Sequence, residues 1–142
     1  MEEDKNLLQT RDRIDDLDLR IQTLINERAE AAQEVARIKL AASPETVFYR
    51  PEREAQVLRQ VKERNQGPLD DETMARLFRE IMSVCLALEK PLHIAYLGPE
   101  GTFTQAAALK HFGHSVTTRP LASIADVFRE VEAGSVDFGV VP

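Results

Sequence analysis

Cysteine and tryptophan are nearly missing from this sequence, which has one cysteine and no tryptophan. The single thiol, Cys85, excludes an internal disulfide and a zinc site built from cysteines. Long apolar runs are also missing, because none approaches the roughly 20 residues that a membrane helix needs. The acidic start from Met1 to Lys5 is not typical of a signal peptide. We therefore expect a soluble, cytoplasmic protein that does not bind a membrane.

Positive charge is in the minority, with 18 lysines and arginines against 24 acidic residues and a formal net charge of -6. Binding to nucleic acid needs a basic face, so a nucleic acid is excluded as the main partner. Because the whole chain is acidic, any cationic binding site must be a small cluster of basic residues. The 142 residues, 43% of them hydrophobic, suffice for one ordinary domain or two small ones with a real core.

Glycine and proline do not occur between Asn6 and Ala41, where apolar residues repeat at helical spacing. This pattern predicts one helix of about 50 Å. A globule of under ~100 residues is too small to cover such a helix from end to end. We expect a second subunit to cover its stripe, which has two columns: Leu7, Ile14, Ile21 and Val35 in one, and Leu17, Leu24 and Ile38 in the other.

Prolines and capping residues divide the following segment into two shorter helices. Ser43-Pro44 breaks the long helix, and Pro51 suits the first turn of a second helix that stops at Gly67-Pro68. Either Asp70 or Asp71 can cap a third helix, which ends at Pro91. Its apolar stripe is Met74, Leu77, Phe78, Ile81, Met82, Cys85 and Leu88.

After Pro91 the pattern changes to alternating strands and helices. Thr102 or Thr104 can cap the first of these helices and Ser123 the second. The order predicts a parallel, right-handed βαβαβ unit. Because the chain stops right after the third strand, we expect an incomplete α/β domain. The expected elements are strand 92–97, turn 98–101, a helix to Phe112, strand 115–119, helix 124–133 and strand 136–141.

Charged residues interrupt the apolar stripes of the helical segment. Arg28 falls in the column of Ile14, while Arg11 and Lys39 flank the same seam. Each alone could extend its stem along an interface or pair with Glu27, Glu30 or Glu34. Three like charges on one apolar seam instead favour an anionic ligand, such as a dianion, that balances them. Arg53, Glu54 and Glu89 are further candidates, whereas His93, His111 and His114 show no spacing typical of metal ligands.

The helical segment resembles the all-helical chorismate mutases over about 90 residues, through Leu8, Arg11, Ile14, Leu17, Asp18, Arg28, Lys39, Arg53-Glu54 and Val57-Leu58. This resemblance implies an intertwined homodimer of three-helix chains that converts chorismate to prephenate without a cofactor or metal. It also implies that Arg11 crosses to the other subunit's site. By the same match, Arg28 and Arg53 bind the substrate carboxylates, Glu54 binds the ring hydroxyl, and Lys39 and Glu89 contact the ether oxygen.

Two positions depart from this family's pattern. Arg50 stands where related enzymes often have an aspartate, which weakens any role for that position. Glu89 stands where some relatives have glutamine, and a carboxyl group donates a hydrogen bond only when it is protonated. We therefore expect turnover to fall as Glu89 ionises.

The second segment resembles the start of prephenate dehydratases, through Tyr96 to Thr104, Ala106-Ala107, Asp126-Val127-Phe128 and Asp137 to Pro142. A Gly-rich turn before a helix N-terminus can bind a substrate carboxylate through backbone N–H groups. Without the lysine of a nucleotide P-loop, this turn does not predict ATP binding. The candidate loop residues are Gly98, Pro99, Gly101, Thr102, Phe103 and Thr104.

Together the segments resemble the bifunctional chorismate mutase-prephenate dehydratases of phenylalanine biosynthesis, with a mutase domain at 1–91 and the start of a dehydratase domain at 92–142. That family's catalytic Thr-Arg motif and its ACT domain lie beyond Pro142. We therefore expect dehydration of prephenate to phenylpyruvate only in a longer protein.

Two other interpretations remain open from the residues themselves. The seam cations could form structural ion pairs in a non-catalytic helical dimerisation module. The second segment could be a ligand-sensing α/β fragment that has no useful mutase activity beside it.

Overall fold

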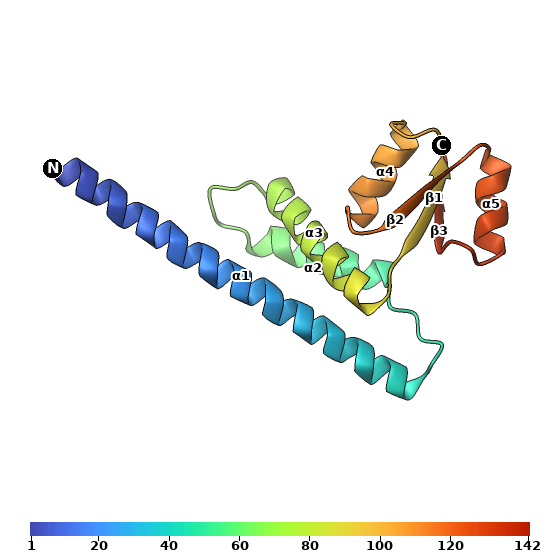
Figure 1. The fold of residues 1–142 in the computed structure, drawn as a ribbon, viewed down its shortest axis with the longest axis horizontal. Helices are drawn as coiled ribbons and strands as arrows, with labels where there is room; N and C mark the ends of the chain where they lie inside the picture. The colour runs from blue at the N-terminus through green and yellow to red at the C-terminus, as the bar shows by residue number, and fades with distance from the viewer.

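The computed structural model describes all residues from Met1 to Pro142. Three helices come first: α1 (Glu2–Ala42), α2 (Pro51–Arg64) and α3 (Asp71–Glu89). Figure 1 shows α1 as a single long rod whose N-terminal half projects beyond α2 and α3. An acidic first turn and Lys39 in the last turn complement its dipole. The predicted all-helical first segment is therefore confirmed.

The loop between α2 and α3 starts earlier than the sequence predicts. Helix α2 ends at Arg64 rather than at Gly67-Pro68. The Asn65 side chain donates to the Leu69 carbonyl at 2.8 Å and to Asp71 Oδ1 at 2.9 Å. These bonds close the loop one turn ahead of the proline. Of the two possible caps for α3, Asp70 is used, since its carboxylate accepts from the Thr73 N–H at 2.7 Å.

The second segment forms a parallel three-stranded sheet in the order β2-β1-β3, which confirms the predicted βαβαβ pattern. Thr102 and Ser123 cap the two helices, as predicted for Ser123 and for one of two threonines. The central strand carries Ile94 and Ala95, which are both fully buried. In chain order the elements are β1 (His93–Leu97), α4 (Phe103–Phe112), β2 (Thr117–Leu121), α5 (Ile124–Glu132) and β3 (Phe138–Val140).

Both edge strands start two residues later than the sequence predicts. Strand β2 starts at Thr117 because the N–H groups of His114 and Ser115 donate to Glu80 and Ser83 of α3. Strand β3 starts at Phe138. Asp137 exchanges two 2.8 Å hydrogen bonds with His93, one through its backbone N–H and one through its carboxylate.

Beta strands and helices of this second segment, residues 93–140, are called the α/β unit below. It packs against α3 on the side away from α1, as Figure 1 shows. Its main core consists of Leu92, Ile94, Ala108 and Phe112, and it also includes Tyr49 from the loop between α1 and α2. The helices and the α/β unit thus share a core residue. The boundary at residues 91 and 92 stays a prediction.

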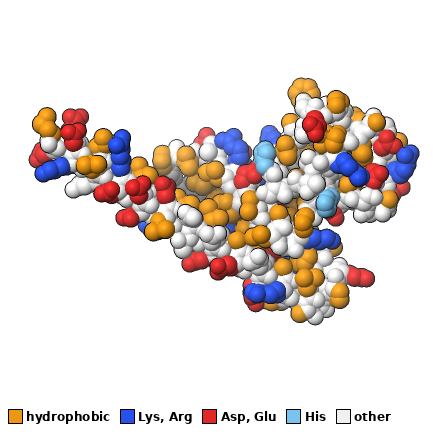
Figure 2. All heavy atoms as spheres, in the orientation of Figure 1, with side chains coloured by type: hydrophobic (Ala, Val, Ile, Leu, Met, Phe, Trp, Pro, Cys, Tyr) orange, Lys and Arg blue, Asp and Glu red, His pale blue; other side chains and the backbone are white.

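The apolar columns of α1 are largely uncovered in the single chain. Leu7, Ile14 and Ile21 are 49%, 51% and 53% exposed, respectively. Figure 2 shows apolar side chains in patches along the projecting part of α1. A chain folded alone therefore leaves much apolar helix surface in water. No helix combines the length and the apolar character that crossing a bilayer would require.

Candidate active site

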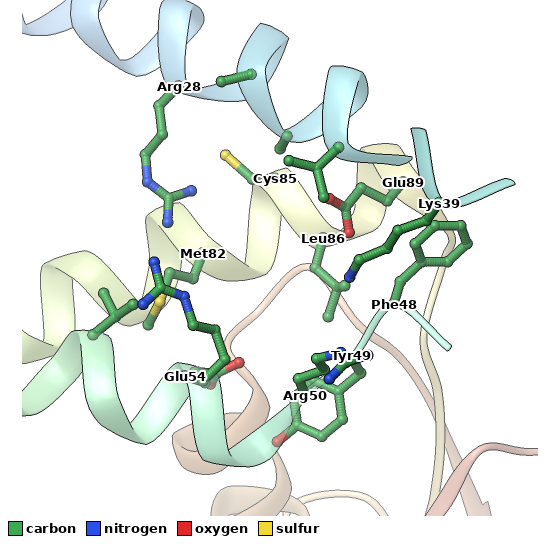
Figure 3. Close-up of a pocket in the computed structure, with 15 residues that line it drawn as sticks. Arg28, Lys39, Phe48, Tyr49, Arg50, Glu54, Met82, Cys85, Leu86 and Glu89 are labelled. Carbon is green, nitrogen blue, oxygen red and sulfur yellow. The ribbon is translucent and has the colours of Figure 1, made fainter. Parts of the chain in front are cut away.

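A cavity of about 440 Å³ lies between α1, α2, α3 and the loop that joins the first two helices. Figure 3 shows its charged side chains entering from different elements. The cavity brings together most of the site residues predicted from the sequence. It is lined by Arg28, Ala31, Ala32, Val35, Lys39, Phe48, Tyr49, Arg50, Arg53, Glu54, Val57, Met82, Cys85, Leu86 and Glu89.

Helix α1 supplies one wall because its lining residues recur every three or four positions. Arg28, Val35 and Lys39 therefore face the same side of the helix. Ala31 and Ala32 lie between them and leave space beneath the longer side chains. Two cations from one helix are thus directed into one cavity (Figure 3).

The first turn of α2 and the last turns of α3 supply the other walls. Pro51 fixes the start of α2, so Arg53 and Glu54 come directly after the cavity loop. On α3, Cys85 and Glu89 are one turn apart and lie on the same face. The two helices therefore contribute one cation and two carboxyl groups.

Positive charge exceeds negative charge in this cavity, although the whole chain carries a net charge of -6. Arg28, Lys39 and Arg53 form no ion pair with any carboxylate of the chain. Arg53 donates only to the amide oxygen of Gln56, at 3.1 Å. Arg50 is 4.0 Å from Glu52. Unpaired cations around an apolar-walled cavity suit an anionic ligand, because such a ligand supplies the missing counter-charge.

Glu89 has an altered pKa in this setting. Burial raises its pKa above the ordinary value for a glutamate, although the positive charges of Lys39 and Arg28 oppose the shift. In Figure 3 the Glu89 carboxyl group and the Lys39 amine both point into the cavity. A raised pKa extends the pH range in which Glu89 is protonated and can donate a hydrogen bond.

Two further cavity residues have altered pKa values: Glu54 in the first turn of α2 and Tyr49 in the loop before it. Burial raises the pKa of Glu54, and the positive charge of Arg79 opposes the shift. Burial, aided by the Glu54 charge, raises the pKa of Tyr49 to about 12. The Nε of Arg79 is buried without a hydrogen-bond partner. Arg79, a partly exposed residue, therefore lies close enough to Glu54 for their charges to interact.

Arg11 is not part of the cavity within one chain. It lies on the exposed N-terminal half of α1, about 25 Å along the helix from Arg28. The prediction that Arg11 enters the site of another subunit stays a prediction.

The predicted loop from Gly98 to Thr104 lies outside the cavity, at the carboxyl end of β1 (Figure 1). Some of its polar groups already have partners on the neighbouring strand and helix. The Thr102 and Thr104 hydroxyls both contact the Leu97 carbonyl, and the Gly101 N–H donates to Gln105 Oε1 at 2.6 Å. Phe103 is 95% exposed. A role for this loop in binding a carboxylate stays a prediction.

Sequence reasoning missed several cavity residues. Phe48 and Tyr49 stand in a loop, where no helical period marks them, and Leu86 looks like any core residue. A possible signal is the pair of aromatic residues placed just before the Arg50-Pro51 helix start. The histidines have other contacts: His111 Nε2 is 3.3 Å from the Tyr49 hydroxyl, and His114 Nδ1 is 2.6 Å from Glu80 Oε1.

Comparison with known proteins gives two adjacent family matches. Residues 10–90 match the family model described as chorismate mutase type II. Residues 94–142 match the one described as prephenate dehydratase.

Curated relatives carry both activities in their names. Proteins named bifunctional chorismate mutase/prephenate dehydratase are 68% identical to the chain in Stutzerimonas stutzeri, covering 100% of the chain, and 65% identical in Pseudomonas aeruginosa, covering 92%. One from Neisseria gonorrhoeae is 50% identical over 98% of the chain. The chain spans 40%, 36% and 37% of the lengths of these three relatives.

Proposed function

Because the chain belongs to the type II chorismate mutase family, we propose that it catalyses the rearrangement of chorismate to prephenate. The observation that carries this proposal is the convergence of Arg28, Lys39 and Arg53, none of them ion-paired, on one cavity of about 440 Å³. Chorismate carries two carboxylates, which supply the missing counter-charge.

The reaction is a single concerted step in which a C–O bond breaks as a C–C bond forms. It needs no nucleophile, metal or cofactor from the protein. The protein accelerates it by holding the substrate in the reactive, ring-stacked conformer and by stabilising negative charge on the ether oxygen. A cavity of preorganised charged groups serves both purposes.

Each charged residue of the cavity has a proposed role in that step. Arg28 and Arg53 bind the two carboxylates through their planar guanidinium groups. Glu54 accepts a hydrogen bond from the ring hydroxyl. Lys39 and protonated Glu89 donate to the ether oxygen, and the raised pKa of Glu89 supports this role.

We also propose that two chains pair through α1 and form two equivalent sites. Exposed apolar columns on a helix that projects beyond its neighbours support this pairing. In such a dimer Arg11 of the partner subunit enters each cavity as a further cation. The proposed assembly is cytoplasmic, with neither nucleic acid nor membrane as a partner.

Residues 92–142 are proposed to be part of a prephenate dehydratase domain, as their family match supports. In a longer protein that domain dehydrates prephenate to phenylpyruvate, with the loop from Gly98 to Thr104 in contact with the substrate. The present chain covers only 40% or less of its relatives named for both activities.

The mutase proposal is tested by following the loss of chorismate with purified Arg28→Ala. We expect kcat/KM to fall by at least about 100-fold, because a preorganised charge is lost from the site. Arg37→Ala is the matched control: Arg37 lies on the same helix, outside the cavity, and pairs with Glu34 at the surface. Wild-type protein without turnover refutes the proposal. Loss of the dimer in Arg28→Ala, measured by light scattering, supports the structural dimerisation module instead.

Subunit mixing tests whether Arg11 crosses between chains. Arg11→Ala and Arg28→Ala are each expected to have little activity alone. In a mixed dimer one site keeps both arginines, so equal mixing should restore about a quarter of wild-type activity. If both arginines came from the same chain, no mixed dimer would contain an intact site and no activity would return.

A further inference from the structure

Tyr49 belongs to two parts of the molecule at once. It lines the cavity on the wall opposite α1, as Figure 3 shows, and it is only 7% exposed. The same side chain is part of the main core of the α/β unit, with Leu92, Ile94 and Phe112. Tyr49 therefore joins the proposed mutase site to the α/β unit. Leu86 of α3 also lines the cavity and packs against the same core, but it is held by its own helix.

Contacts from the α/β unit determine where Tyr49 lies. Tyr49 is in the loop between α1 and α2, so no helical hydrogen-bond ladder holds it. Its ring packs against Phe112 with 5.6 Å between centroids, and edge-on against Phe138 with 5.2 Å. Its hydroxyl is 3.3 Å from His111 Nε2. Helix α4 and strand β3 thus surround the side chain.

The C-terminal end of α4 is itself held close to α3, where the Gly113 backbone meets the Ser83 side chain. A Cβ built at Gly113 would be 2.5 Å from Ser83 Cβ, and the backbone φ there is +82°. Around this contact, the Ser115 N–H donates to Ser83 Oγ at 3.3 Å and the His114 N–H to Glu80 Oε2 at 3.1 Å. Only glycine allows α4 to approach α3 this closely.

We infer that Tyr49 is a positioning residue for the mutase reaction, and that the α/β unit, docked on α3 through Gly113, holds it in the cavity wall. This inference rests on the proposed function. Tyr49 comes directly before the cap of α2, whose first turn carries Arg53 and Glu54. Releasing Tyr49 frees that end of α2, and the groups that hold the substrate lose their common geometry.

The effect of Glu54 on Tyr49 supports this coupling. The Glu54 charge contributes to the raised pKa of Tyr49, so the two groups lie close enough to interact. Displacement of Tyr49 therefore also changes the surroundings of a carboxylate proposed to bind substrate.

The test is Gly113→Ala in the full chain, compared with Gly134→Ala. Both glycines have positive φ, +82° and +78°, so both substitutions strain the backbone of the α/β unit. A Cβ at Gly134 meets nothing within 4 Å, whereas one at Gly113 clashes with Ser83. The pair separates loss of docking from loss of stability in the α/β unit.

We expect Gly113→Ala to raise KM for chorismate about tenfold with a smaller change in kcat, because substrate-holding groups are displaced. Gly134→Ala should keep the wild-type KM. A purely structural defect reduces the amount of active protein, which lowers apparent kcat and leaves KM unchanged. Equal KM values for the two variants overturn the inference.

A double variant identifies Tyr49 as the link. Tyr49→Ala should raise KM by itself, and adding Gly113→Ala to it should change KM little further, because both act through one side chain. Independent, multiplying effects contradict the inference. If Gly113→Ala does not fold, Ser83→Val places the clash on the α3 side of the same contact and has the same expected result.

The controls distinguish this inference from the proposed function. Absence of chorismate turnover in the wild-type chain refutes the mutase proposal and the inference with it. An active wild type together with an unchanged KM in Gly113→Ala and Ser83→Val refutes the inference alone.

Discussion

The cavity and the α/β unit differ in whether their cationic side chains form ion pairs. In the α/β unit, Arg119 pairs with Glu130 at 2.7 Å and Arg129 pairs with Asp126 at 2.9 Å. In the cavity, Arg28 and Lys39 have no carboxylate partner, although Glu89 is near enough for their charges to oppose its raised pKa. Paired surface charges contribute little to stability, whereas unpaired charges in a cavity are available to a ligand.

The loop from Gly98 to Thr104 also differs from the cavity, although both are proposed to bind a substrate carboxylate. Its Thr102 and Thr104 hydroxyls are bonded to the Leu97 carbonyl, so a ligand that used them would have to replace existing bonds. The backbone N–H groups of Thr102, Phe103 and Thr104 form no hydrogen bond. Arg28 and Lys39 in the cavity have no ion pair that a ligand would need to replace. The cavity thus offers charged side chains to an anion, whereas the loop offers only uncharged N–H groups.

Of the substitutions considered below, removal of one cavity cation should lower kcat/KM for chorismate the most. Lys39→Ala is expected to lower kcat/KM by on the order of 1,000-fold, since Lys39 is proposed to stabilise the charge that develops on the ether oxygen. Lys62→Ala is the matched control, because Lys62 pairs with Glu72 at 2.7 Å outside the cavity. Steady-state kinetics measure both. Similar losses in the two variants would mean that pairing does not distinguish functional from structural cations here.

The protonation state of Glu89 should make turnover depend on pH. Because its pKa is raised, the carboxyl group is protonated below that pKa and ionises as the pH rises through it. Wild-type turnover should therefore fall as pH increases, on the order of tenfold once Glu89 is ionised. Glu89→Gln keeps a donor at every pH and should give a flat profile. Glu63→Gln, on exposed α2 surface, should keep the wild-type profile, and a Glu89→Gln profile identical to it would refute the role.

The sequence predicted most of the fold because the signals are local. Pro51 starts α2, and Asp70, Thr102 and Ser123 each cap a helix within three residues of the N–H that they accept from. The pattern predicts the edge strands two residues early, because their observed starts depend on contacts with distant residues. The bonds from His114 and Ser115 to α3 join residues more than 30 positions apart.

The cavity could be predicted in part for the same reason. Arg28 and Lys39 share one helix face, so their convergence follows from spacing alone. Joining them to Arg53, Glu54 and Glu89 depended on the family resemblance. Tyr49 could not be found in this way, because its position depends on rings more than 60 residues further along the chain.

Breaking a surface ion pair in the α/β unit should change kcat/KM the least. Arg119→Ala removes the partner of Glu130 at a site far from the cavity, so kcat/KM should stay within about twofold of wild type. Hydrogen bonds from Ser135 and Arg119 lower the pKa of Glu130, so this contribution to stability is present above the unfolded pKa and is lost as pH falls. The melting temperature of the variant should therefore be slightly lower at neutral pH and should converge with wild type in acid. A large loss of turnover would show that paired surface charges of the α/β unit also act on the mutase site, which would remove the contrast between the two regions.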